Sequence, residues 1–306
     1  MAEGVFVLGI FAADTTYRSD GLPRMGETVM GRGFTLGPGG KGSNQAVAAA
    51  RLGARTRFLG RLGDDAFADL AEETWREAGV ESLAPRDAKL ATGAACILVD
   101  HATGDNAIIV AAGAAAAITV ADVEARRGEI EDASVFLGQL EAPWEATRRA
   151  LEIARQAKRT TILNPAPAAP LDDDAIALCD WLTPNETEAA TLSGVDASTA
   201  DGAERAARAL LARGAGGVAV TLGERGGLVV TGEGATEVPA FHVGDVAETT
   251  GAGDAFNAGF AVALAEGAEP IEAARFGCAV AGLSVTRLGA AAAMPTRSEV
   301  EALLRR

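Results

Sequence analysis

Residues 37–60 read GPGGKGSNQAVAAARLGARTRFLG, and three different local patterns follow one another within them. It begins with a glycine-rich loop, continues through the alanine-rich segment Asn44–Leu52 and ends in the apolar run Thr56–Gly60. Gly53 follows the helical segment at the position where a glycine commonly ends a helix. The stretch therefore predicts a loop, a helix and a buried strand in succession, which is the repeating unit of a parallel α/β sheet.

The same alternation of short apolar runs with amphipathic segments continues along the chain. The segment Asp65–Ala78 carries its apolar residues at helical spacing. Further buried strands are predicted at Val5–Ile10, Ser134–Leu137, Thr161–Leu163, Trp181–Thr183, Val218–Leu222, Gly226–Thr231 and Glu237–Phe241. Further helices are predicted at Trp144–Ala157, Glu186–Leu192, Gly202–Ala212, 253–266, 270–286 and from 297, with one more starting at Asp172–Asp174. This order predicts an α/β fold with a largely parallel sheet and helices on both of its faces.

Two regions interrupt the alternation. The first is polar and glycine-rich, with β-type fragments at Glu27–Met30 and Gly33–Leu36. The second predicts a hairpin, in which Ala94–Val99 and Ala107–Val110 are joined by a turn. We expect a small β lid, made of residues 13–35 and 92–111, beside a core made of residues 1–12, 36–91 and 112–306.

The chain is strongly acidic. It has 27 Lys and Arg against 42 Asp and Glu, which gives a net charge of −15. That charge repels phosphate backbones and anionic lipid, so we expect no nucleic-acid or membrane partner. The three cysteines, Cys96, Cys179 and Cys278, are widely spaced and form neither a disulfide framework nor a metal motif, which favours a cytoplasmic location.

The glycine-rich loop allows three interpretations. Gly37, Gly39 and Gly42 satisfy the pattern G-x-G-x-x-G of dinucleotide-binding sites, but the pattern does not directly follow the first core strand. The loop also contains Lys41 and Asn44, which suit hydrogen bonds to a neutral polyol. On spacing alone, a substrate-binding loop, a dinucleotide site and a merely structural turn all remain open.

Residues 248–257, ETTGAGDAFN, open a second alanine-rich helix. The small residues from Gly251 to Gly253 leave backbone N–H groups free at a helix N-terminus, which is an arrangement that binds anions. Asp254 is placed to act as a base beside that anion site. The alternative is that Asp254 only caps the helix.

Two further motifs lie where strands end. In TPNETE, residues 183–188, Asn185 and Glu188 share one face of a helical turn and could hold hydrated Mg²⁺, or could simply cap the helix. In TLGERGG, residues 221–227, a strand runs into a glycine-rich turn that could border a nucleotide or only join two strands. In open α/β sheets, ligands bind at such strand ends.

The order of these motifs resembles the ribokinase family of carbohydrate kinases. The resemblance covers nearly the whole chain and is carried by segments such as GGKGSNQAVAAARLGA, LNPAPA, TPNETEA and TTGAGDAFNAG. It implies a three-layer α/β/α sandwich with a small β lid, and an ATP-dependent sugar kinase acting most naturally on D-ribose at O5. Another pentose, a ketohexose or a nucleoside as acceptor, or a non-catalytic binding protein on the same fold, are the alternatives.

The resemblance also implies roles for individual residues. Asp254 would be the general base, and the backbone N–H groups of Gly251, Ala252 and Gly253 would stabilise the transferring phosphoryl group. The residues implied to bind the sugar are Asp14, Gly40, Lys41, Asn44, Glu141 and Asp254. The residues implied to bind ATP and its Mg²⁺ are Asn185, Glu188, Thr221, Gly223, Gly226, Gly253 and Cys278.

The resemblance further implies a K⁺ site and a homodimer formed through the lid edges. The K⁺ site would be formed by Glu248, Thr250, Val285, Leu288 and Gly289. Three departures from the family pattern bear on these expectations. Glu248 stands where Asp is usual and Ala293 where Ser is frequent, which leaves activation by K⁺ open. Ala12 stands where Asn is usual, which leaves the identity of the sugar open.

Overall fold

The computed structural model describes residues 4–305; residues 1–3 and 306, which the predicted core includes, lie outside the described residues. Its centre is a nine-stranded sheet. The strands are β1 (Gly4–Leu8), β4 (Arg55–Leu59), β6 (Glu81–Ser82), β10 (Val135–Gln139), β11 (Thr160–Asn164), β12 (Trp181–Leu182), β13 (Gly217–Thr221), β14 (Gly227–Thr231) and β15 (Gly234–Val238). Their order is β15-β14-β13-β12-β11-β10-β1-β4-β6, and every pair from β13 to β6 is parallel. Only β14 and β15 run antiparallel to their neighbours.

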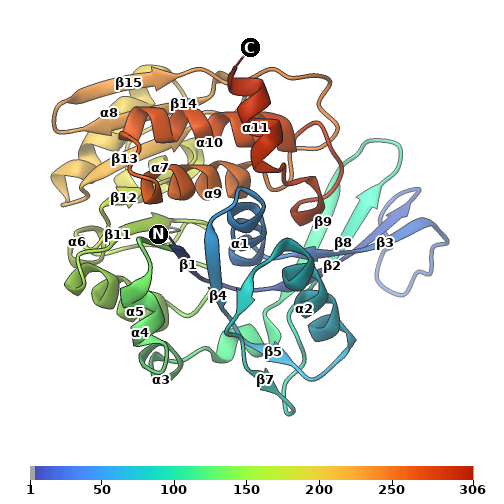
Figure 1. Ribbon diagram of the computed structural model, residues 1–306. Coiled ribbons are helices and arrows are strands. Elements are labelled where there is room, and N and C mark those ends of the chain that lie inside the picture. Colours follow the sequence, from blue (N-terminus) through green and yellow to red (C-terminus); the bar gives the residue numbers. More distant parts are fainter. Residues whose placement is uncertain (1–3, 306) are drawn as a thin grey trace.

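Helices cover both faces of this sheet (Figure 1). One face packs against α1 (Lys41–Arg51), α2 (Ala66–Ala78), α9 (Ala252–Ala265), α10 (Pro270–Ser284) and α11 (Arg297–Leu304). The other packs against α3 (Val120–Glu124), α4 (Arg127–Asp132), α5 (Trp144–Gln156), α6 (Asp173–Ile176), α7 (Glu186–Ser193) and α8 (Ala200–Ala212). In β1, Val5 and Val7 join the first core while Phe6 and Leu8 join the second, as alternation along a strand requires. The predicted three-layer α/β/α sandwich is confirmed.

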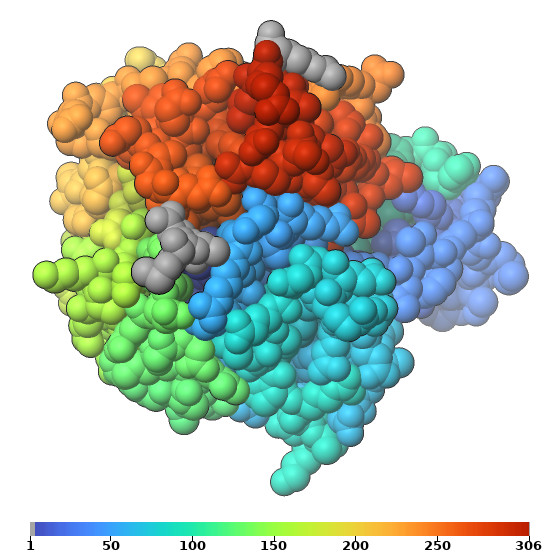
Figure 2. Space-filling model, viewed as in Figure 1, coloured from blue at the N-terminus to red at the C-terminus, as the bar shows by residue number. Residues whose placement is uncertain are grey.

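A separate four-stranded sheet extends from the side of the main body (Figures 1 and 2). It contains β2 (Ala12–Ser19), β3 (Gly31–Gly39), β8 (Ala94–Asp100) and β9 (Asn106–Ala111), in the order β3-β2-β8-β9. The chain enters this sheet at Ala12 and leaves β3 at Gly39, directly before α1. The small sheet is therefore joined to the start of α1 with only Gly40 between them.

Several local predictions were wrong. The fragment Glu27–Met30 is not a strand, because Gly26 has a positive φ and a turn forms in which the Glu27 N–H donates to the Arg24 carbonyl at 2.9 Å. Strand β15 ends at Val238 rather than Phe241, since Pro239 has no N–H to donate to the ladder. The helix after the glycine loop begins at Lys41, three residues before Asn44, because Gly40 makes the turn that starts it.

The remaining elements are short. Strands β5 (Leu62–Gly63) and β7 (Arg86–Asp87) pair with each other, and three 3₁₀ turns lie at Gly113–Ala117, Gly223–Arg225 and Ala291–Ala293. Helices α3 and α4 were not predicted, because neither is long enough to show helical periodicity. Within residues 4–305, no helix combines the length and the apolar character that crossing a membrane requires.

Candidate active site

Polar side chains gather where three neighbouring strands of the central sheet end. Gln139 ends β10, Asn164 ends β11 and Thr183 follows β12. The N-termini of α1, α7 and α9 point toward the same place, beside a cavity of about 180 Å³. The cavity is lined by Lys41, Asn164, Ala166, Thr183, Asn185, Glu188, Thr221, Gly251, Gly253, Asp254 and Asn257. This is the edge at which open α/β sheets bind their ligands.

Asp254 lies in the first turn of α9 and is 6% exposed. Its two carboxylate oxygens accept hydrogen bonds of 2.9 Å from the side-chain amides of Asn44 and Gln45. Burial raises the pKa of Asp254, whereas the charge of Lys41 and the two amide hydrogen bonds act in the opposite direction. Asp254 is not the helix cap, because that position belongs to Gly251. The carboxylate is therefore held by donors from another helix and faces the cavity.

The backbone at the start of α9 is shaped by Gly251, whose φ is +80°. A Cβ at this position would also lie 3.0 Å from the Cβ of Ala290. Among the described residues, the N–H groups of Gly251 and Gly253 have no acceptor, whereas the Ala252 N–H donates to the Thr249 carbonyl at 3.1 Å. Two of the three N–H groups expected in the anion site are thus free to bind a ligand in this conformation.

The predicted sugar-binding residues lie together at the start of α1. Gly40 begins the helix with a φ of +88°, and the Lys41 N–H donates to a carboxylate oxygen of Glu141 at 2.8 Å. Asp14 on β2 packs its carboxylate against Gly39. Gly37 and Gly39 belong to β3 of the small sheet and Gly42 to α1, so the glycine pattern is not the first strand-to-helix turn that a dinucleotide site requires.

The carboxylates around Lys41 have shifted pKa values. Burial, and then the charge of Glu248, raises the pKa of Asp14 to about 6. Burial also raises the pKa of Glu141 to about 7; the charge and N–H group of Lys41 oppose the rise, and Asp254 and Asp14 add to it. Carboxylates, an ammonium group and an amide supply both acceptors and donors for the hydroxyl groups of a polyol.

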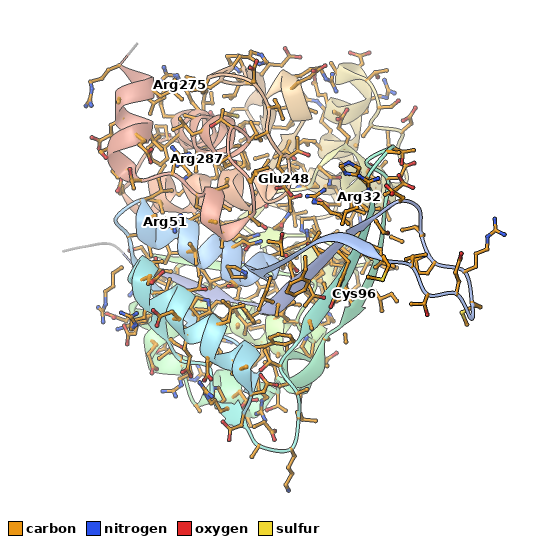
Figure 3. All side chains as sticks on the ribbon, turned by 90° about the vertical axis from the view of Figure 1, so that its right-hand side faces the viewer. Arg32, Arg51, Cys96, Glu248, Arg275 and Arg287 are labelled. Atoms are coloured by element: carbon orange, nitrogen blue, oxygen red, sulfur yellow. The ribbon has the colours of Figure 1, made fainter. Side chains whose placement is uncertain are left out.

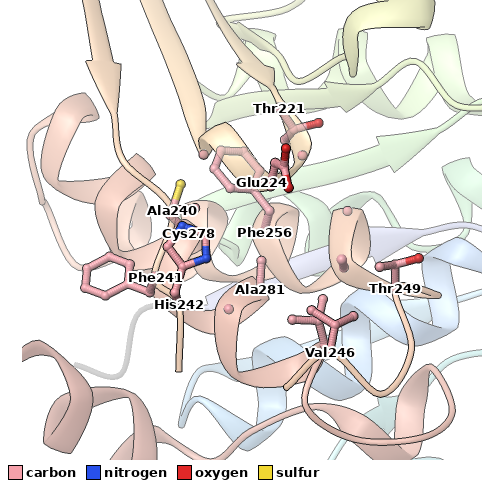
Figure 4. A pocket seen from close by; sticks show the side chains of 16 residues that line it. Thr221, Glu224, Ala240, Phe241, His242, Val246, Thr249, Phe256, Cys278 and Ala281 are labelled. Carbon is pink, nitrogen blue, oxygen red and sulfur yellow. The ribbon is translucent and has the colours of Figure 1, made fainter. Parts of the chain in front are cut away.

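A second cavity of about 260 Å³ adjoins the first and shares Thr221 and Gly253 with it (Figure 4). Apart from Asn185 and Glu188, which were predicted to hold Mg²⁺, all the residues predicted to bind ATP line this second cavity: Thr221, Gly223, Gly226, Gly253 and Cys278. Other residues in its wall are Glu224, Ala240, Phe241, His242, Val246, Thr249, Ala252, Phe256, Ala281, Gly282 and Val285. A largely apolar cleft of this kind suits a flat aromatic base. His242 was not predicted here, since a single His in an irregular loop carries no sequence signal.

Asn185 and Glu188 cap α7 reciprocally. The Asn185 side chain accepts from the Glu188 N–H, and the Glu188 carboxylate accepts from the Asn185 N–H, both at 2.8 Å. Burial and, more weakly, the charge of Asp254 raise the pKa of Glu188. The hydrogen bond from the Asn185 N–H and the charge of Lys41 act in the opposite direction. Both residues line the smaller cavity beside Asp254. Their oxygens keep lone pairs for water, so the pair fits a hydrated Mg²⁺ ion while also capping the helix.

Three of the five residues expected at a K⁺ site, Glu248, Val285 and Gly289, lie together in the region where Figure 3 labels Glu248. The Glu248 carboxylate accepts from the Gly289 N–H at 2.8 Å. The Val285 carbonyl accepts from the N–H groups of Ala247 and Glu248, at 2.8 and 3.2 Å. Because both lone pairs of that carbonyl are used, the Val285 carbonyl does not fit as a ligand of K⁺ in this conformation.

Comparison with known proteins identifies the family of this chain. A family model described as pfkB family carbohydrate kinase matches residues 2–297. The chain belongs to the pfkB family of carbohydrate kinases.

Three relatives of this pfkB chain illustrate the similarity. It is 40% identical to a ribokinase of Bacillus subtilis over 99% of both chains. It is 32% identical to a deoxyribokinase of Salmonella typhi over 95% of both. The structure of Arabidopsis thaliana ribokinase complexed with ribose and ATP covers all of both chains, with a TM-score of 0.94 and 31% identity.

Proposed function

We propose that this protein is an ATP-dependent kinase that phosphorylates D-ribose at O5, giving ADP and D-ribose 5-phosphate. One observation carries the proposal. Asp254 faces a cavity that Lys41 also lines and that continues, through Thr221 and Gly253, into an apolar cleft. Asn44 and Glu141 line neither cavity but bond directly to Asp254 and to the Lys41 N–H, respectively. A base at that junction lies between an acceptor hydroxyl and a phosphate donor.

Asp254 is the residue that moves the proton. Its carboxylate takes the proton of the O5 hydroxyl as that oxygen attacks the γ-phosphorus of ATP, and the bond from that phosphorus to the ADP oxygen breaks. The proton leaves to solvent after the products depart. The N–H groups of Gly251 and Gly253 stabilise charge on the phosphoryl oxygens, with Ala252 joining them if its bond to Thr249 opens.

The sugar is held by hydrogen bonds from residues of α1, β2 and the segment after β10. Asp14 and Glu141 accept from hydroxyl groups, while Lys41 and the backbone at Gly40 donate. The Oδ1 atom of Asn44 is buried and has no partner among the described residues. An unsatisfied buried acceptor is costly, so a sugar hydroxyl that donates to Asn44 would be well recognised.

The nucleotide occupies the apolar cleft, with Cys278 and Gly226 beside the base and Gly253 beside the phosphates. Asn185 and Glu188 would hold Mg²⁺ through water. When bound, Mg²⁺ neutralises charge on the phosphate oxygens. Since these contacts use backbone N–H groups and the metal, the net charge of −15 does not oppose binding of a small phosphate donor.

A second candidate acceptor is 2-deoxyribose. The chain is similar to a deoxyribokinase over almost its full length, and Ala12 at the start of the small sheet offers no polar side chain to the sugar. Ribose remains the leading proposal because the more similar of the two relatives is a ribokinase.

An ADP-release assay tests the proposal. Ribose, 2-deoxyribose, fructose and adenosine are each assayed with ATP and Mg²⁺, with and without K⁺. We expect the largest kcat/KM with ribose, and no turnover of any of these acceptors would refute the kinase proposal. Asp254→Asn should lower kcat by about 10³-fold or more while leaving ATP binding intact.

We also infer a homodimer in the cytoplasm. Strand β9 is an edge strand of the small sheet, and its residues Ile108, Ile109 and Val110 are each more than half exposed. An apolar edge strand of this kind favours pairing with a second copy. Sedimentation should show a dimer, and Ile109→Lys should give a monomer; a wild-type monomer would refute this inference.

A further inference from the structure

A hydrogen-bonded chain of five uncharged side chains lies buried behind Asp254. Its members are Gln139, Gln45, Asn164, Thr183 and Asn257. They come from β10, α1, β11, the end of β12 and α9, and none is more than 6% exposed. Among the described residues, only the Oε1 atom of Gln139 in this network has no partner. The hydrogen bonds of the other groups hold the members in one arrangement.

Gln45 is the branch point of this network. Its Nε2 group donates to the Oδ1 of Asp254 at 2.9 Å and to the Oδ1 of Asn164 at 3.2 Å. Its Oε1 accepts from the side-chain amide of Gln139 at 2.6 Å. Both N–H bonds of the amide are therefore used, and Gln45 is the one member of the network that bonds directly to the carboxylate.

The contact between Asn164 and Thr183 fixes which groups donate and which accept in these hydrogen bonds. The Nδ2 group of Asn164 donates to the backbone carbonyl of Thr183 at 2.9 Å, and a carbonyl can only accept. The Oδ1 of Asn164 must then face Gln45, which has to present its NH₂ group. The same NH₂ group faces Asp254, so the network offers that carboxyl a donor and no acceptor.

We propose that Gln45 is a positioning residue that holds Asp254 in the orientation and the ionised form that proton abstraction requires. This inference rests on the proposed function, in which Asp254 is the base. Gln45 does not line either cavity and acts through Asp254 alone. A donor-only neighbour stabilises the carboxylate over the protonated acid, because the carboxylate accepts more strongly and the O–H of the acid would need an acceptor that the Gln45 amide does not offer.

Charged groups also face Asp254 from three directions. Lys41 on α1 favours the ionised form, whereas Glu141 after β10 and Glu188 on α7 are like charges. Burial raises the pKa of Asp254, and the hydrogen bonds from Asn44 and Gln45 lower it. Loss of the Gln45 donor should therefore move the ionisation of Asp254 to higher pH.

Three variants of the full chain test this inference. Gln45→Met keeps the length of the side chain and removes its donors. Gln139→Met is the matched control, because it also leaves a buried amide unpaired but keeps both Gln45 donors. Gln45→Glu replaces the side-chain NH₂ group with an oxygen and so places a second carboxylate beside Asp254. This variant still tests the inference if Gln45→Met does not fold.

The readout is kcat as a function of pH at saturating ATP and sugar. Gln45→Met should lower kcat by about tenfold to a hundredfold, as expected for a lost hydrogen bond to a charged group, and should move the acidic limb of the profile to higher pH. Gln45→Glu should move the limb further, and Gln139→Met should leave it in place even where it lowers thermal stability.

Asp254→Asn distinguishes a failure of the inference about Gln45 from a failure of the proposed function. If this variant is inactive and both Gln45 variants keep the wild-type limb, the role of Gln45 is refuted and the proposed base stands. If Asp254→Asn keeps a near wild-type rate, the proposed function fails, and the role of Gln45 fails with it.

Discussion

The side-chain amide of Asn44 donates a 2.9 Å hydrogen bond to the carboxylate of Asp254, which lies 210 residues further along the chain. The bond joins the first turn of α1 to the first turn of α9, and the two helices pack against each other. The residues proposed to bind the sugar and the residue proposed to take its proton are therefore held in one rigid arrangement. A hydroxyl bound by Asn44 is placed beside the base.

Asn44→Leu should impair sugar binding and turnover together. The variant removes a donor to Asp254 and the unpaired acceptor proposed to bind the sugar, so we expect the KM for the sugar to rise at least about tenfold and kcat to fall. The KM for ATP should not change. The control is Ser43→Ala, which removes the hydrogen bond that Ser43 accepts from Trp75 on the other side of α1. An unchanged sugar KM in Asn44→Leu would remove Asn44 from the site.

Gly40→Ala should destabilise the protein more than Gly53→Ala does. Both glycines have a φ near +90°, at which a Cβ costs about 1–2 kcal/mol. At Gly40 the new Cβ would also lie 2.5 Å from the Ile10 carbonyl oxygen, whereas at Gly53 no atom lies within 4 Å. Urea unfolding of the two variants measures the difference directly. Equal losses in free energy of unfolding would mean that the backbone at Gly40 can move away from Ile10.

The fold was largely predictable because its signals are local. The alternation around residues 37–60 predicts a strand–helix unit wherever it recurs, and the glycines at 53 and 79 end helices as expected. The prediction failed where a turn or a proline outweighed the β-type composition, at Glu27–Met30 and at Pro239.

The site was predictable only in part. Asp254, Lys41 and Asn185 belong to motifs that can be read along the chain. Gln45 bonds to partners 209, 119 and 94 residues away, and no local spacing reports such contacts. The one available signal was that Gln139 and Asn164 are polar residues at the ends of buried strands, where ligand-binding sheets place functional side chains.

Glu141 should make stability depend on pH in a defined direction. Its pKa is about 7 in the folded protein against 4.5 as its ordinary value, mainly because of burial. Between those two values the folded state binds more protons than the unfolded state, so the free energy of unfolding falls as pH rises. The full contribution across the window is about 3 kcal/mol.

Glu141→Gln isolates this contribution, because an amide does not titrate and its oxygen can still accept the Lys41 N–H. We expect the variant to gain stability relative to the wild type as the pH is raised from 5 to 8. Urea unfolding at both values measures the change. A difference between the two proteins that does not vary with pH would contradict the raised pKa of Glu141.

Cys278→Leu should weaken nucleotide binding selectively. Cys278 lies in the wall of the larger cavity, which Thr221 and Phe256 also line, and is 5% exposed (Figure 4). A leucine there would project more bulk into the cleft proposed to hold the base. We expect the KM for ATP to rise several-fold, with little change in the KM for the sugar, because none of the residues proposed to bind the sugar lines the larger cavity.

The matched control is Cys278→Ala, which leaves the cleft open and should keep the KM for ATP near that of the wild type. Burial raises the pKa of the Cys278 thiol to about 12, so the thiol stays protonated and its loss should not alter the chemistry. If Cys278→Leu raised the KM for the sugar instead of the KM for ATP, the assignment of the two cavities would have to be exchanged. If it changed neither, the base would bind away from this wall.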